Sequence, residues 1–114
     1  MKKYCQEIIE NAQKICLQED YLIKKRCKEH NKAIERLLEI SKELINLDCK
    51  EMLLELLNST DERVKLAAGS ICLKLKINVK EAIKTLQLVQ EKSKDGTLSF
   101  TAEMTVREYK RETL

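Results

Sequence analysis

Apolar residues recur every three or four positions along most of this chain, which is the spacing of helices that bury one face. The pattern predicts six helices, over residues 3–17, 21–46, 49–57, 61–76, 79–93 and 99–111. Residues 21–46 keep one angular phase and contain no Pro or Gly, so they are predicted to form a single helix of roughly 39 Å. The pair Asp95-Gly96 marks the only convincing loop.

Polar residues stand where four of these helices begin, and their types suit helix N-caps. Ser59 with Glu62, and Asn78 with Glu81, have the spacing in which the two residues cap each other's backbone. Single caps are predicted for the helices over 21–46 and 49–57, at Asp20 and Asp48.

The stretch 61–65 raises the question of whether its charged residues do chemistry. Asp61 and Arg63 are two positions apart, so on a helix they face different sides and are not expected to pair. Asp61 and Glu62 suit the positive end of the helix dipole, while Arg63 and Lys65 are predicted to project into solvent. Capping and solubility account for the whole stretch.

The predicted helix over 61–76 is apolar on two opposite sides. One stripe begins at Val64 and the other contains Leu66 and Leu73. Such a helix is either sandwiched between neighbours or presents one side to a partner. The adjacent small residues, including Gly69, let another helix approach, although Gly inside a helix costs about 1 kcal/mol relative to Ala. We expect Gly69 to mark a helix contact.

Composition agrees with a helical protein and restricts its class. The chain of 114 residues fits one domain over residues 1–114, contains no Pro and two Gly, and is 4% aromatic. Charged residues make up 36% of the chain, but their signs are mixed and the net charge is +3. This balance gives solubility rather than a concentrated positive field, so it indicates no particular partner.

Several features predict a cytoplasmic protein. Glu7 and Glu10 interrupt the apolar positions that follow the first lysines, so no secretory signal core is expected. No segment approaches the run of about 18 apolar residues that a membrane span requires. The five cysteines are an odd number without a C-x-x-C pair, and they are predicted to be free thiols.

The best chemical candidate is the C-x-x-H pair formed by Cys27 and His30. Structural zinc needs four ligands, and the sequence offers no second pair. Both residues also lie on the apolar stripe of the long helix, where a buried thiol and a half-buried imidazole are ordinary. No phosphate-binding loop, nucleophile motif or pair of catalytic carboxylates is present. We therefore predict no enzyme activity, no catalytic residue, no metal and no cofactor.

The stretches "DERVKLAAGSICLKL" and "NVKEAIKTLQLV" resemble the short bacterial form of the HEAT repeat. The shared features are an Asp, a Val before a basic residue, paired alanines, a Leu-rich helix end, a tight turn and a second helix with Ala and Leu inward. Together with "EHNKAIERLLEISKEL" and "SFTAEMTVREY", the layout is similar to small bacterial HEAT-like domains of unassigned function. Over about residues 50–110, this resemblance implies a short superhelical stack of helix pairs and transfers no catalytic residues.

These observations favour a non-catalytic module that binds another protein. The predicted contact residues are Arg63, Lys65, Leu66 and Leu73, and the loop before the last helix. One specific version is an immunity-type inhibitor that neutralises a toxin. The alternative is a nucleic-acid-associated protein that uses the basic run Lys24, Lys25, Arg26 and Lys28, although no aromatic stacking platform accompanies the run. A membrane or a small molecule is not expected as a partner.

Overall fold

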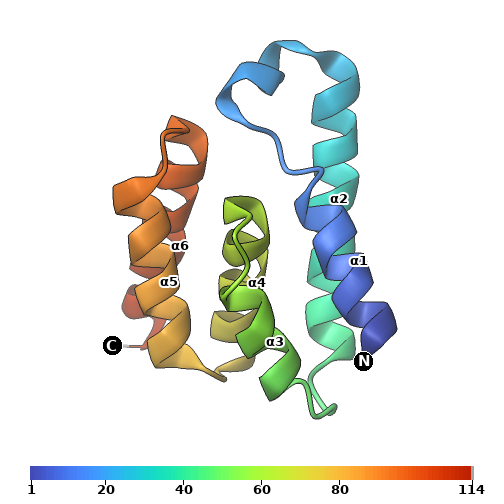
Figure 1. The fold of residues 1–114 in the computed structure, drawn as a ribbon, viewed down its shortest axis with the longest axis vertical. Coiled ribbons are helices and arrows are strands. Elements are labelled where there is room, and N and C mark those ends of the chain that lie inside the picture. Colours follow the sequence, from blue (N-terminus) through green and yellow to red (C-terminus); the bar gives the residue numbers. More distant parts are fainter. Residues whose placement is uncertain (114) are drawn as a thin grey trace.

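Six α-helices and one short 3-10 helix follow one another in the computed structural model, which describes residues 1–113 (Figure 1). Within these residues there is no strand, so the prediction of an all-α fold is confirmed. Leu114, the last residue of the predicted domain, lies outside the described residues. The elements are α1 Lys2–Ala12, η1 Gln18–Leu22, α2 Lys24–Glu43, α3 Lys50–Leu57, α4 Glu62–Leu75, α5 Val79–Lys92 and α6 Gly96–Thr113.

Helices that are consecutive in the sequence pack as neighbours, in the pairs α1 with α2, α3 with α4, and α5 with α6 (Figure 1). The first pair is joined on its surface by Arg36 of α2, whose guanidinium donates to Glu7 of α1 and to Glu43.

None of the described helices combines the length and the apolar character that crossing a bilayer requires.

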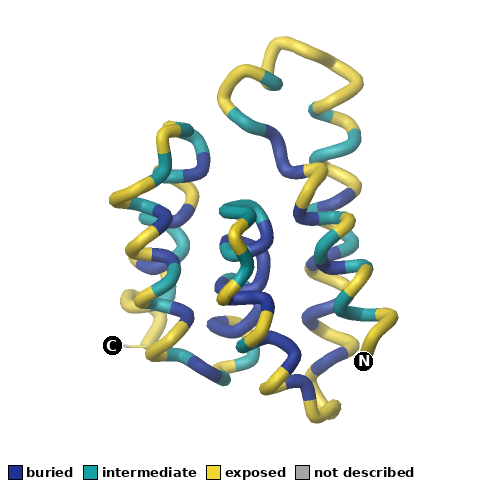
Figure 2. Tube along the Cα trace, in the orientation of Figure 1, coloured by how far each residue is buried: buried dark blue, intermediate teal, exposed yellow. Residues whose placement is uncertain are grey.

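α4 lies at the centre of the molecule and contacts five other helices, namely α1, α2, α3, α5 and α6. Both of its predicted apolar stripes are buried, because these neighbours cover it from several sides (Figure 2). Gly69 marks a close helix contact, as predicted. A Cβ atom at Gly69 would lie 2.9 Å from Cγ and Cδ2 of Leu86 on α5. The absence of a side chain at Gly69 therefore lets α5 approach α4.

The first helix is shorter than predicted. It ends at Ala12, and the backbone N–H groups of Lys14 and Ile15 donate to carbonyls three residues back, in a tight turn. Ile15 and Cys16 are nevertheless buried. Their burial continued the apolar pattern past the end of the helix, so the periodicity predicted residues that are buried but not helical.

The long second helix is also shorter, because residues 18–22 form η1 and α2 begins only at Lys24. Asp20 was predicted to cap α2, but it does not. Its carboxylate instead accepts the backbone N–H of Leu17 at 3.1 Å and so stabilises η1. At its other end α2 stops at Glu43. With 20 residues it spans about 30 Å.

The predicted caps of α3 and α4 are wrong in detail, whereas Asn78 occupies the N-cap position of α5 as predicted but makes no side-chain cap hydrogen bond. Cys49, not Asp48, precedes α3, and its side chain makes no cap hydrogen bond. Asp61, not Ser59, caps α4 by accepting the backbone N–H of Arg63 at 2.9 Å. Neighbouring residues that all suit a cap cannot be ranked by type alone, so the pattern located the starts of α3 and α4 to within one residue but did not identify the capping side chain.

Two of the residues in the predicted capping boxes bind elsewhere in the fold. Glu62 accepts a hydrogen bond from the hydroxyl of Ser93 at 3.0 Å. Asn78 precedes α5 in a left-handed conformation, with φ of 48°, and its amide donates to the carbonyl of Lys50. Both side chains therefore join segments that are far apart in the sequence.

The last helix begins at Gly96, three residues earlier than predicted. The carboxylate of Asp95 accepts the backbone N–H groups of Thr97 and Leu98, at 3.0 and 3.1 Å. Its other oxygen accepts the backbone N–H of Gln18 at 2.8 Å. Asp95 thus starts α6 and holds η1 against it, which the local pattern of a turn pair did not reveal.

Candidate functional site: a groove over α4

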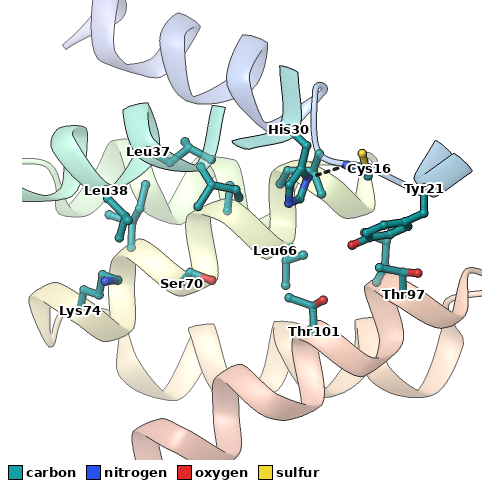
Figure 3. A pocket seen from close by; sticks show the side chains of 15 residues that line it. Cys16, Tyr21, His30, Leu37, Leu38, Leu66, Ser70, Lys74, Thr97 and Thr101 are labelled. Carbon is teal, nitrogen blue, oxygen red and sulfur yellow. Dashed lines mark hydrogen bonds between the residues drawn. The ribbon is translucent and has the colours of Figure 1, made fainter. Parts of the chain in front are cut away.

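A groove of about 350 Å³ lies over α4, between α2 and α6 (Figure 3). In the described part of the chain, α2 and α6 each contact α4 but do not contact each other. The 3-10 helix η1 contacts both α2 and α6 at one end of the space. The groove therefore exists because α4 holds its two neighbours apart.

Most of the lining is apolar or small. α4 supplies the floor, where Ala67 and Ser70 have side chains too short to fill the space. The lining residues are Ile15, Cys16, Tyr21, His30, Ile34, Leu37, Leu38, Leu66, Ala67, Ser70, Ile71, Lys74, Thr97, Leu98 and Thr101. Leu38 remains 39% exposed on the α2 wall, and Tyr21 is 50% exposed at the end closed by η1. Large apolar side chains are thus open to solvent along the groove.

The electrostatics of the lining are simple. Among the described residues that line the groove, Lys74 is the only one that is charged at neutral pH, and none is an Asp or a Glu. In Figure 3, Lys74 and Leu38 lie at one end, whereas His30, Cys16 and Tyr21 lie at the other. An anionic group in the groove at the Lys74 end would therefore meet a complementary charge, whereas Glu108 and Glu112 line the adjoining hollow on the other side of Lys74.

His30 has a defined structural role at its end of the groove. Its Nδ1 accepts the backbone N–H of Cys16 at 2.9 Å, so in the neutral ring the proton is on Nε2. The ring of Tyr21 lies 6.5 Å away, centroid to centroid. Burial lowers the pKa of His30. This side chain therefore fastens the segment between α1 and η1 to α2.

The nearby thiols also donate hydrogen bonds to backbone carbonyls. The Cys16 thiol donates to the carbonyl of Arg26, and the Cys27 thiol donates to the carbonyl of Tyr21. Burial raises the pKa of the Cys16 thiol, and the Cys27 thiol nearby raises it further. Both effects keep Cys16 protonated and make it a poor nucleophile or metal ligand. Within residues 1–113, no three His, Cys, Asp or Glu side chains are grouped so that they could hold a metal ion.

Acidification is expected to weaken the fold through His30. Its pKa in the folded chain is below the ordinary value of 6.5, so its contribution to stability is complete above that pH and is lost as the pH falls below it. Protonation of Nδ1 removes the acceptor for Cys16, which costs about 1 kcal/mol. Urea denaturation of the wild type and of His30→Ala, at a pH above 6.5 and at an acidic pH well below it, measures the effect. The stability difference between them should shrink at the acidic end, and a difference independent of pH would contradict the assignment.

Two of the four predicted partner-binding residues line a groove or hollow in the structure, and the other two do not. Leu66 lies on the groove floor, and Leu73 lines an adjoining hollow of about 240 Å³ together with Ser70 and Lys74. Both leucines are buried, with 3% and 5% of their surface exposed. Arg63 and Lys65 line neither space. The apolar side of the helix thus faces the groove, but the two cations do not.

Arg63 was predicted to project into solvent, but its side chain makes two contacts within the protein. Its guanidinium donates to the carbonyl of Gln13 at 2.8 Å, just after the end of α1. Its Nε also lies 3.6 Å from the carboxylate of Asp61. The prediction that these two residues cannot pair was wrong, because Asp61 has an extended cap conformation and is not part of the helix.

The basic run at the start of α2 is on the surface. Lys24, Lys25, Arg26 and Lys28 are all exposed, and no acidic residue occurs in the first turn of the helix. These side chains lie outside the groove lining.

Sequence reasoning missed the groove residues Ser70, Lys74, Thr97 and Thr101. A signal for two of them was present, since Ser70 and Lys74 are polar residues beside the stripe that contains Leu66 and Leu73. Comparison with family models, with curated proteins and with solved structures gives no match to this chain. The resemblance to HEAT repeats therefore stays a prediction.

Proposed function

We propose that this protein is a non-catalytic module that binds another protein through the groove over α4. The observation that carries the proposal is an apolar groove whose wall and end expose Leu38 and Tyr21 to solvent. Concave apolar surfaces of this kind are the usual places where proteins bind partners or ligands.

The construction of the groove supports this role. Its floor and side walls come from helices that are anchored in the core by Leu37, Ile71 and Leu98, all of them buried. A surface held in this way loses little freedom on binding, which favours affinity. The succession of three helix pairs is also compatible with the short superhelical stack that HEAT-like repeats form.

A non-catalytic role is supported by the chemistry of the lining. None of residues 1–113 that line the groove supplies a carboxylate as a general acid or base, and the Nδ1 of His30 accepts a hydrogen bond from the backbone of Cys16. Five free cysteines suit a reducing compartment, and we therefore propose a cytoplasmic location. Neutralisation of a toxin is the specific version of protein binding that we retain for testing.

Site-specific photo-crosslinking in the native cell tests the proposal. A photoreactive residue replaces Leu38 in the groove or, as a matched control, Leu88, which is 43% exposed on α5. We expect a protein to be crosslinked from position 38 and not from position 88. Adding Ser70→Trp, which fills the groove floor, should abolish the product, because the bulky ring occupies the space that the partner uses. The same set of products from both positions would contradict the proposal.

Two further outcomes decide between versions of the function. If the crosslinked protein arrests growth and the chain restores it, the immunity version is supported. If position 38 captures nothing, while the purified chain binds DNA or RNA with a steep dependence on salt, the basic run on α2 is the functional surface and the groove proposal fails.

A further inference from the structure

The geometry points to the kind of segment that occupies the groove, namely an amphipathic helix of about four turns with an acidic side chain against Lys74. This inference rests on the proposed function and specifies the partner. It is argued from the backbone of the lining, the extent of the exposed apolar surface and the charge at Lys74.

The backbone of the lining favours a helix over an extended segment. The walls and floor of the groove are helices, whose own N–H and C=O groups are already paired, and the described chain has no strand edge. An extended segment in the groove would find few partners for its backbone beyond the hydroxyls of Ser70, Thr97 and Thr101. A helix satisfies its own backbone and can place an apolar face on the lining.

Exposed apolar residues also lie farther along the chain, after the end of α2, beside the charged residues Asp48 and Lys50. Past Leu38 and Lys74, a further hollow lies between the segment after α2 and the end of α4, and it is distinct from the adjoining hollow that Leu73 lines. Its lining includes Ile45 and Leu47, which are 63% and 44% exposed. From His30 to Glu43, the last residue of α2, the chain advances about 20 Å at helical rise, which is close to four turns of an α-helix. An occupant of this length would cover the exposed apolar residues at both places.

Lys74 sets the charge of the occupant. It is exposed, and none of residues 1–113 forms an ion pair with it. Glu108 and Glu112 of α6 share the adjoining hollow with Lys74, but of these three residues only Lys74 also lines the groove. An acidic side chain on the occupant would meet Lys74 at the border of an apolar surface, where charge pairs fix the register and orientation of a bound helix.

Selection from a display library tests the inference with a defined probe. The full chain is the bait, and the library consists of random peptides of about 16 residues, or roughly four turns. We expect the enriched peptides to carry apolar residues at helical spacing and at least one Asp or Glu. Enrichment of peptides without helical spacing, or of basic helices, would overturn the inference, as would the absence of any enriched peptide.

Charge reversal at Lys74 provides the quantitative test. Lys74→Glu should weaken binding of the selected acidic peptide by about tenfold, and exchanging the peptide's acidic residue for Lys should restore part of the loss. Lys84→Glu is the matched control, because Lys84 is exposed on α5 and does not line the groove. Equal effects of the two substitutions would contradict a specific role for Lys74.

The two levels of the proposal can fail separately. If crosslinking from position 38 captures a protein whose attachment site lies in an extended segment, the protein-binding function stands and the helix inference is wrong. If a small apolar compound or a second copy of this chain competes with the selected peptide for the groove and no partner protein is captured, both are wrong.

Discussion

Leu86→Ala is expected to lower the free energy of unfolding by about 2–5 kcal/mol, the range for removing a large apolar side chain from a core. Leu86 is fully buried on α5, and its side chain lies directly over Gly69 of α4. Its removal leaves a cavity at the contact between these two helices. Urea denaturation followed by circular dichroism measures the change. A loss well below 1 kcal/mol would show that the contact is not formed as described.

The dependence of this effect on Gly69 gives a sharper test. Gly69→Ala alone places a Cβ 2.9 Å from Leu86, and overpacking of this kind costs about 1–3 kcal/mol, offset by about 1 kcal/mol of helix propensity. In the Leu86→Ala background the clash is absent and only the gain in propensity remains. We therefore expect Gly69→Ala to destabilise the wild type but to stabilise the Leu86→Ala variant. Additive effects would contradict the proposed contact.

Asn78→Ala is expected to destabilise the protein by about 2–4 kcal/mol. Asn78 is buried in the turn between α4 and α5. Its amide donates to the carbonyl of Lys50 at 2.9 Å and lies 3.9 Å from the sulfur of Cys72. Alanine removes the donor, leaves a carbonyl unpaired and tolerates the left-handed backbone less well than asparagine. Thermal and urea unfolding both measure the loss.

Two companion variants separate the causes of this loss. Asn78→Gly keeps the left-handed backbone at no steric cost but removes the amide, so it should retain only the hydrogen-bond part of the loss. Lys76→Ala is the matched control, because Lys76 has a similar φ of 59° but is exposed. It is expected to change stability by less than about 1 kcal/mol. If Asn78→Gly is as stable as the wild type, backbone strain alone would explain the loss in Asn78→Ala.

The sequence predicted the helices from α3 to α5 to within two residues, because in this part of the chain burial and helical periodicity coincide. It also predicted the contact at Gly69. The same reasoning failed for residues 13–22, where Ile15 and Cys16 are buried in a turn, and periodicity cannot distinguish a buried turn from a buried helix. The caps failed for a related reason, since Asn78 and Glu62 bind partners about 30 residues away that no local pattern reveals.

The groove could be predicted only in part. Leu66 and Leu73 were recognised as an apolar side of α4 that a partner could cover, and the structure places both beside hollows. The opposite wall depends on where α6 begins, which is set by Asp95 and its hydrogen bond to Gln18. That contact joins residues 77 positions apart in the chain. Thr97 and Thr101 therefore carried no signal of a site in the sequence alone.

Methyl NMR of the chain, titrated with the protein captured from position 38, tests the central claim most directly. We predict that the partner shifts the methyl signals of Leu38, Leu66 and Leu98, which line the groove, and leaves that of Leu88 on α5 unchanged. Shifts confined to Leu88 and other residues outside the groove would show that the protein binds its partner elsewhere.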